Sequence, residues 1–140
     1  MTPFGKWKPI KTRKALPQWE RVKGCAYLVM RSNGIGEVNS DVNAGWKYQR
    51  EERDHWQSPN EMMSSGAGDC EDFAILKRAI IGRGEIIIGY DNILGGNHAV
   101  LFVDGVVLDC THDRLLTPEQ MPHFNPIMGM DAFRSWVFAC

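Results

Sequence analysis

The sequence lacks any apolar run long enough to cross a membrane. A spanning helix needs about 20 consecutive apolar residues, and no stretch of this chain approaches that length. The N-terminus also lacks the apolar segment of a secretory signal. We therefore expect a protein that does not enter membranes and that stays in the cytoplasm.

Closely spaced cysteines are also missing. The cysteines at positions 25, 70, 110 and 140 form no CxxC pair, which argues against a zinc knuckle and against a dithiol redox motif. Disulfides are rare in proteins that are not exported. We expect the four thiols to be free.

A strong excess of charge of one sign is absent as well. The chain carries 16 Lys plus Arg against 17 Asp plus Glu, a formal net charge of -1. Such a balance argues against a broad nucleic-acid-binding surface, so we expect no nucleic-acid partner. Only the N-terminus is locally basic. We interpret residues 1–16, which contain five lysines and arginines and no acid, as a flexible, solvated basic arm.

Length and composition indicate a single domain spanning residues 1–140. Domains of about 100–150 residues are the commonest size, and 44% hydrophobic with 24% charged residues is typical of soluble globular proteins.

Helical patterns come first in the chain: 17–31, 36–44, a short helix capped by Ser58, and a central helix over 70–81. Strand patterns follow at 85–90, 98–104 and 106–110, then a loop containing Pro122 and Pro126, and a last strand at 132–139. This order predicts an α+β domain, in which the central helix packs on a small antiparallel sheet.

A candidate nucleophile stands at the start of the central helix. Asp69 is a good helix cap and Asp72 lies three residues later, so Cys70 is predicted to be the first helical residue. The positive end of a helix dipole and a nearby imidazole both favour a thiolate. The position is weak evidence alone, because free cysteine is usually a small buried apolar residue.

A predicted β-hairpin supplies the partners that such a thiol needs. The dipeptide Asp104-Gly105 favours a two-residue turn, which pairs position 103 with 106 and position 100 with 109. His98 and Asp109 then become diagonal neighbours on one face, about 7–8 Å apart at the backbone and within reach of a hydrogen bond. We predict that Cys70 attacks, His98 transfers the proton and Asp109 orients the imidazole. Taken separately, a hydrogen-bonded strand-end histidine and a turn-capping aspartate are equally good interpretations.

The remaining cysteines are interpreted as structural residues. Strand alternation places Cys110 on the face opposite Asp109. Cys25 and Cys140 show no motif that points to chemistry.

Acidic residues surround the candidate nucleophile. Asp69, Glu71 and Asp72 place negative charge beside Cys70 and oppose its ionisation. A hard cation such as calcium prefers several carboxylate oxygens and would neutralise the cluster. Acidic residues are also favoured in any first helical turn, so metal binding and ordinary helix capping both stay open.

These motifs resemble the bacterial transglutaminase-like cysteine proteinases, whose best-known members are the LapG-type adhesin-cleaving proteases. The similar segments lie between Val38 and Asp109, about half of the chain: 38–39, 43, 56–61, 66–73, 77, 97–101 and 107–109. Exported relatives carry a signal sequence and are larger, and they have asparagine where this chain has Cys110. We therefore favour a compact cytoplasmic or phage-derived variant.

The resemblance implies a papain-like, transglutaminase-like fold and cleavage of a peptide bond. It implies no particular substrate. The residues it assigns are a catalytic triad of Cys70, His98 and Asp109, and calcium ligands at Asp69, Glu71 and Asp72.

Residues and resemblance together predict a thiol hydrolase, a cysteine peptidase or amidase that acts on a protein or peptide through a thioester. The chemistry requires no cofactor. The backbone N–H of Cys70 is one natural oxyanion donor, and Trp56 and Gln57 are candidates for the second donor or for substrate contact. Two alternatives stay open: a transglutaminase-type acyl transferase, and a catalytically silent papain-like module that binds a partner protein.

Overall fold

The fold is taken from a computed structural model, which describes residues 9–14, 34–50, 55–131 and 134–138. The helix predicted over 17–31 lies outside these residues. The first half of the chain forms β1 (Pro9–Lys14), α2 (Ile35–Gly45), β2 (Lys47–Tyr48), α3 (Pro59–Ser65), β3 (Ala67–Gly68) and α4 (Cys70–Ile81). The second half forms β4 (Glu85–Asp91), β5 (Gly96–Val103), β6 (Val106–Asp109), β7 (His112–Leu116), the 3-10 helix η2 (Pro118–Gln120), β8 (Phe124–Met130) and β9 (Arg134–Phe138).

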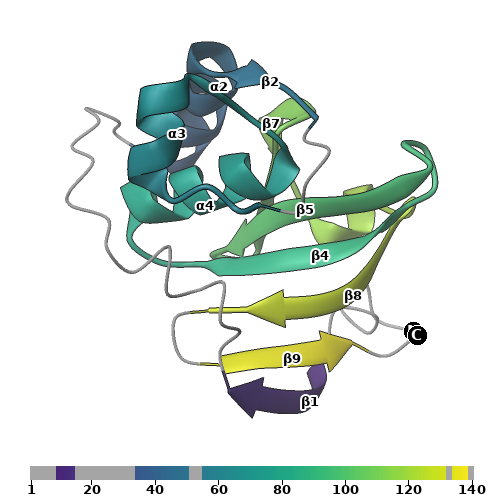
Figure 1. The fold of residues 1–140 in the computed structure, drawn as a ribbon. Coiled ribbons are helices and arrows are strands. Elements are labelled where there is room, and N and C mark those ends of the chain that lie inside the picture. The colour runs from purple at the N-terminus through teal and green to yellow at the C-terminus, as the bar shows by residue number, and fades with distance from the viewer. Residues whose placement is uncertain (1–8, 15–33, 51–54, 132–133, 139–140) are drawn as a thin grey trace.

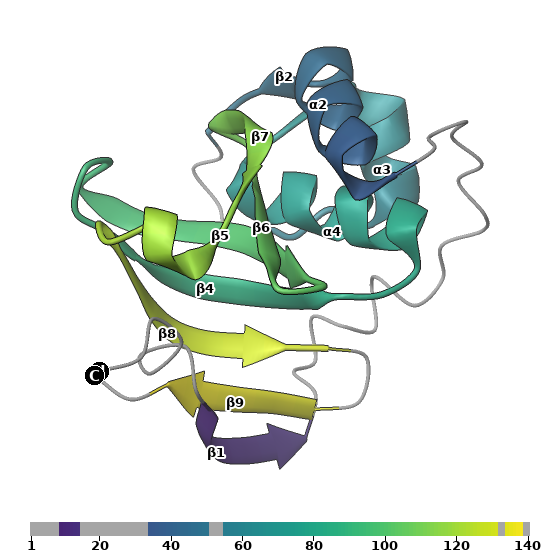
Figure 2. The ribbon, with the colours of Figure 1, turned by 180° about the vertical axis from the view of Figure 1, so that it is seen from behind.

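A seven-stranded sheet with the order β1-β9-β8-β4-β5-β6-β7 forms the body of the molecule. Every neighbouring pair in this sheet is antiparallel, while β2 and β3 form a small parallel pair. Helices α2, α3 and α4 gather beside β4 to β7, and β8, β9 and β1 extend away from them (Figures 1 and 2). The predicted α+β architecture, a helix packed on an antiparallel sheet, is confirmed. Within the described ranges, no helix is both long and apolar enough to cross a membrane.

The central helix begins and ends where its sequence predicts. Asp69 caps α4: its side chain accepts from the backbone N–H of Asp72, and the Asp72 carboxylate accepts from the N–H of Asp69. This reciprocal capping satisfies two N–H groups that the first turn leaves free. Gly82, at φ 84°, ends the helix in the left-handed conformation that glycine adopts without strain.

The two shorter helices also agree with the predictions. Ser58 caps α3 with Glu61 as its reciprocal partner, and Pro59 occupies the first helical position. The helix expected over 36–44 is α2, one residue longer at each end.

The β5–β6 hairpin has the predicted register. Val103 pairs with Val106 and Leu101 with Leu108. Asp104 and Gly105 have φ angles of 53° and 78°, and positive φ at both central residues is what a type I′ turn requires. The turn therefore fixes which residues of β5 and β6 stand side by side.

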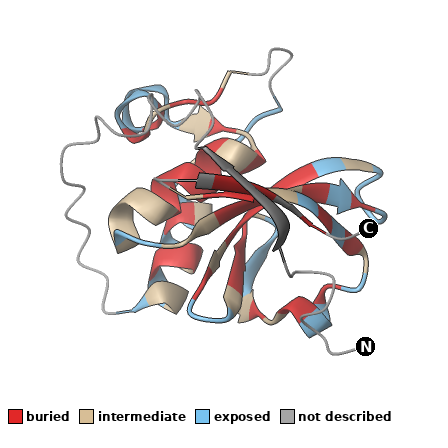
Figure 3. Ribbon diagram, turned by 90° about the horizontal axis from the view of Figure 1, so that it is seen from below, coloured by how far each residue is buried: buried red, intermediate tan, exposed pale blue. Residues whose placement is uncertain are grey.

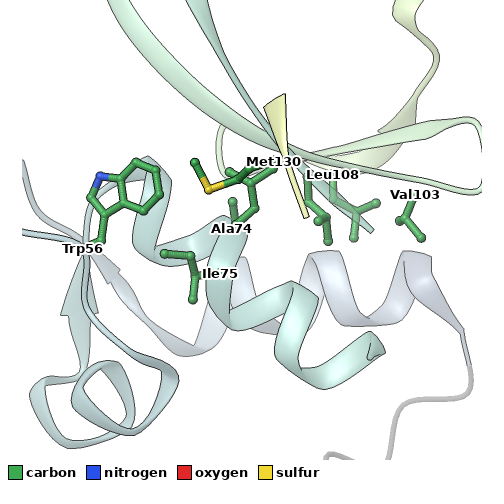
Figure 4. Packing of buried hydrophobic residues seen from close by; sticks show 8 residues of the cluster. Trp56, Ala74, Ile75, Val103, Leu108 and Met130 are labelled. Atoms are coloured by element: carbon green, nitrogen blue, oxygen red, sulfur yellow. The ribbon is translucent and has the colours of Figure 1, made fainter. Parts of the chain in front are cut away.

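The core lies on both faces of the central strands. Between α4 and the sheet, Ala74 and Ile75 pack against apolar residues such as Leu108 and Met130 (Figure 4). Trp56, from the segment before α3, joins the same cluster. A second cluster on the other face includes residues of β4, β5, β8 and β9, and buried residues follow the strands through the middle of the molecule (Figure 3). Burial on both faces explains why β4 and β5 read as nearly continuous apolar runs.

The arm expected at residues 1–16 is corrected over the part that the structure describes. Residues 9–14 form β1, an edge strand whose Thr12 pairs with Trp136 of β9. Lysines do not prevent this pairing, because charged side chains are common on edge strands, where they discourage further strand addition.

The prediction of a loop around Pro122 and Pro126 is confirmed for Pro122 and wrong for Pro126. Pro122 lies in a turn, whereas Pro126 lies within β8. The β4–β8 register shifts here, since Gly89 pairs with Pro126 and Ile88 with Met128. This bulge leaves residue 127 unpaired and accommodates a proline that cannot donate a ladder hydrogen bond. The predicted last strand is β9.

Candidate active site

Cys70 is the first residue of α4, as predicted, and its side chain is buried. Its thiol lies 3.4 Å from Oε2 of Glu71. Burial and the negative charge of Glu71 raise the pKa of the thiol, and a backbone hydrogen bond with Ala99 opposes them. The Ala99 contact ties the thiol to β5, beside His98 in the chain. The acidic residues oppose ionisation as expected, but burial is the larger cause.

The predicted contact between His98 and Asp109 is confirmed. Nε2 of His98 lies 2.8 Å from Oδ1 of Asp109, and both side chains are almost completely buried, at 2% and 1% exposure. Oδ1 also accepts from the backbone N–H of Thr111 at 3.0 Å. Burial alone would raise the pKa of Asp109, but the hydrogen bond and charge of His98, with Thr111, lower it to about 2. The carboxylate therefore stays ionised and holds Nε2 of the ring.

Two asparagines of α2 hold the turn that follows β6. Nδ2 of Asn43 donates to the carbonyl oxygens of Asp109 and His112, at 3.0 and 3.1 Å. Asn39 donates to the carbonyl oxygens of His112 and Asp113, both at 2.8 Å. Their spacing of four residues places both amides on one face of the helix. Sequence reasoning assigned these residues no role, although that spacing was a signal.

Gln57 is a structural bridge, which argues against its expected role as an oxyanion donor. Its Nε2 donates to the carbonyl oxygen of Ala67 at 2.8 Å and to Oδ2 of Asp72 at 3.0 Å. Its backbone N–H donates to Oδ1 of Asp72 at 2.7 Å. Because an amide nitrogen has two hydrogens, neither is left for a substrate. Trp56, the other candidate, lies in the core cluster.

The three acidic residues around Cys70 are not equivalent. Both oxygens of Asp72 accept hydrogen bonds, from Gln57 and from the N–H of Asp69. Burial, then the hydrogen bond and charge of Glu71, raise the pKa of Asp69 to about 7. Asp69 and Glu71 are thus crowded carboxylates that a cation would relieve, whereas Asp72 already has partners.

Cys110 lies beside the His98–Asp109 pair, which corrects its expected position on the opposite face. Its Sγ, a ring nitrogen of His98 and a carboxylate oxygen of Asp109 all lie within 4.8 Å of one another. The prediction was wrong because β6 ends at Asp109, and Cys110 and Thr111 form a turn into β7. Strand alternation therefore stops one residue before Cys110. Sequence patterns gave no signal for this end point.

Solved structures share this fold. Calcium-bound LapG from Legionella pneumophila matches with a TM-score of 0.68 and 27% identity, over 74% of this chain and 66% of LapG. The EGTA-treated form of LapG matches with a TM-score of 0.67 and the same identity, over 74% of this chain and 64% of LapG. A candidate cysteine protease from Cytophaga hutchinsonii matches with a TM-score of 0.53 and 16% identity, over 81% of this chain and 40% of that protein, which indicates the fold alone.

The matched chains are longer than this one, which spans just under two thirds of LapG. No protein-family model and no curated protein sequence matches the chain. The matches with LapG agree in fold with the family that the motifs around Cys70, His98 and Asp109 resemble. These residues lie on α4 and on the β5–β6 hairpin. The chain is therefore a structural relative of LapG, with the fold of the transglutaminase-like cysteine proteases that its motifs resemble.

Proposed function

We propose that this protein is a thiol hydrolase, a cysteine peptidase or amidase, with Cys70 as nucleophile, His98 as base and Asp109 as orienting acid. The observation that carries the proposal is the buried contact of 2.8 Å between His98 and Asp109. The bond between Cys70 and the backbone of Ala99 supports it, because it brings the thiol to the same strand. Protein or peptide amides are the proposed substrates.

In the proposed mechanism the two ring nitrogens of His98 have different tasks. Asp109 binds Nε2 of His98, so Nδ1 takes the thiol proton as Sγ of Cys70 attacks the substrate carbonyl carbon. Nδ1 then gives this proton to the leaving amine as the C–N bond breaks, leaving a thioester. Water attacks the thioester, and its proton passes through Nδ1 back to the thiolate. The backbone N–H of Cys70 is the natural donor to the oxyanion.

The negative charge around Cys70 supports a calcium ion as part of this proposal. Asp69 and Glu71 are the residues that would hold it, while both oxygens of Asp72 keep their hydrogen bonds with Gln57 and with the N–H of Asp69. The cation would supply positive charge that favours the thiolate. Two observations support calcium: the crowding that raises the pKa of Asp69, and the calcium-bound form of LapG.

Alkylation of the native 140-residue chain tests the proposal. Iodoacetamide labelling of Cys70, followed by mass spectrometry, should be at least about 10-fold slower in His98→Ala, because the base is lost. His55→Ala is the matched control, since His55 pairs with the exposed Glu61 and its loss should leave the rate unchanged. Calcium should accelerate labelling relative to EGTA. The proposal fails if Cys70 reacts no faster than in denatured protein and His98→Ala has no effect.

One observation favours a second candidate, a silent module that binds a partner protein. Burial raises the pKa of Cys70 strongly, which opposes thiolate formation. Incubation of the wild type with candidate protein substrates distinguishes the two: a module binds without cleavage and binds equally well as Cys70→Ala. Amine acceptors added to the same reaction would yield cross-linked product only from an acyl transferase, which uses the same thioester.

A further inference from the structure

A buried carboxylate oxygen without a hydrogen-bond partner lies at the end of β6. Asp109 is 1% exposed, and within the described residues its Oδ2 has no hydrogen-bond partner. Nδ1 of His112 is 4.0 Å away, beyond hydrogen-bond distance. Leaving a buried acceptor without a partner is costly. The site therefore calls for a group that none of the described residues supplies.

The neighbours of this oxygen are metal ligands of a particular kind. Sγ of Cys110, a ring nitrogen of His98 and a carboxylate oxygen of Asp109 lie within 4.8 Å of one another. Thiolate, imidazole and carboxylate are the ligands that zinc takes in proteins, usually in a tetrahedron. Zinc ligands in such a tetrahedron lie roughly 3.5 Å apart, so small side-chain rotations would bring these three atoms to a common ion. Calcium and magnesium prefer oxygen alone.

Access and charge also suit a divalent cation. Cys110 is half-buried rather than enclosed, so an ion can enter from solvent. A Cys110 thiolate and the Asp109 carboxylate together carry two negative charges, which neutralise the two positive charges of a divalent cation. Burial and the negative charge of Asp109 raise the pKa of the Cys110 thiol, and the ammonium of Lys77 opposes them; a bound cation would favour the thiolate.

We propose that His98, Asp109 and Cys110 form a binding site for a thiophilic divalent cation such as Zn²⁺, with an open position for water. This site is separate from the acidic residues around Cys70 and takes a softer ion. A cation on Nε2 of His98 would replace the hydrogen bond with Asp109, and a cation on Nδ1 would occupy the nitrogen that accepts the thiol proton. A zinc-loaded protein would then lack its catalytic base, a consequence that rests on the proposed function, whereas the binding itself does not.

Calorimetric titration of the reduced 140-residue chain with zinc chloride tests the site. We expect one tight equivalent, weakened at least about 100-fold in Cys110→Ala, since even outer-shell substitutions at metal sites cost about 10–100-fold. Cys25→Ala and Cys140→Ala remove thiols that lie outside the described residues and should bind as wild type. Equal affinity of Cys110→Ala and wild type, or loss of the tight equivalent in either control, would overturn the proposal.

Cobalt substitution gives a second readout that is independent of affinity. Tetrahedral Co²⁺ with a thiolate ligand absorbs through sulfur-to-metal charge transfer, and this band should disappear in Cys110→Ala, with the fold checked by circular dichroism. Absence of the band in the wild type counts against the site. Cys70→Ala separates the two proposals: it should abolish peptidase activity and leave the zinc affinity unchanged.

Discussion

Asn43 of α2 donates a hydrogen bond from Nδ2 to the backbone carbonyl oxygen of Asp109, 3.0 Å away. The same nitrogen lies 3.1 Å from the carbonyl oxygen of His112 and 3.2 Å from Oδ1 of Asp113. Through these contacts a helix far from the hairpin in sequence holds Asp109, the hydrogen-bond partner of His98. The position of the acid thus depends on how α2 docks.

Substituting Asn43 with alanine should weaken both the fold and the site. Loss of its hydrogen bonds should lower the free energy of unfolding by about 1–2 kcal/mol, measured by urea denaturation. The alkylation rate of Cys70 should fall several-fold, because the turn carrying Asp109 loosens. Ser40→Ala is the control, since among the described residues the Ser40 hydroxyl bonds only to carbonyl oxygens of its own helix. An unchanged alkylation rate in stable Asn43→Ala would argue against this coupling.

Gln57 should prove to be structural when it is replaced. Gln57→Ala removes the amide that joins Asp72 to the carbonyl oxygen of Ala67, and should lower the free energy of unfolding by about 1–3 kcal/mol. Gln57→Glu should cost more, because it sets a second carboxylate against the buried Asp72. Thermal and urea unfolding measure both variants, with exposed Gln49→Ala as the control. Full stability combined with lost activity would instead point to the oxyanion role.

Lys77 should make stability rise with pH on the alkaline side. Burial lowers the pKa of this ammonium from 10.5 to about 8. Below pH 8 the lysine is charged in both the folded and the unfolded protein, so the full cost of burying the charge lowers the free energy of unfolding. Above pH 8 the unfolded chain binds more protons than the folded one, so this contribution to the free energy of unfolding rises with pH up to about 10.5.

The variant Lys77→Met isolates this effect. Between pH 7 and pH 9.5, the free energy of unfolding of the wild type should rise by about 2 kcal/mol relative to that of Lys77→Met. Loss of the hydrogen bond from Lys77 to Asn39 adds an offset that does not depend on pH. Exposed Lys47→Met serves as the control. A difference that stays constant across this range would show that Lys77 titrates normally.

The hairpin turn should be sensitive to a side chain at Gly105. Gly105→Ala must place a β-carbon at φ 78°, where only glycine is free of strain, and should cost about 1 kcal/mol or more. Asp104→Asn should be tolerated, because asparagine is common in type I′ turns. Denaturant unfolding compares the two variants. A Gly105→Ala protein as stable as wild type would contradict the assigned turn.

Local rules made the main site features predictable from sequence. The reciprocal cap of Asp69 and Asp72 identifies the start of α4, and the Asp104-Gly105 turn fixes the register that brings His98 to Asp109. Both depend on residues close together in the chain. Because side chains alternate between the two faces of a strand, this register is enough to place His98 and Asp109 on the same face.

Features that depend on distant neighbours were not predictable. Cys110 joins the site because β6 stops at Asp109, where α2 and β7 hold the turn. Pro126 enters a strand because a bulge opposite β4 accepts it, and β1 exists because β9 offers an edge for pairing. Gln57 acts as a bridge because Asp72 lies beside it in the folded chain. None of these partners is adjacent in sequence.

The short connection between β5 and β6 affects the order in which the site can assemble. His98 and Asp109 are 11 residues apart, and closing such a short loop costs less chain entropy than bringing either residue to Cys70. Contacts of low sequence separation also tend to form early in folding. His98 and Asp109 therefore belong to one local folding unit, and Cys70 joins them only when α4 docks.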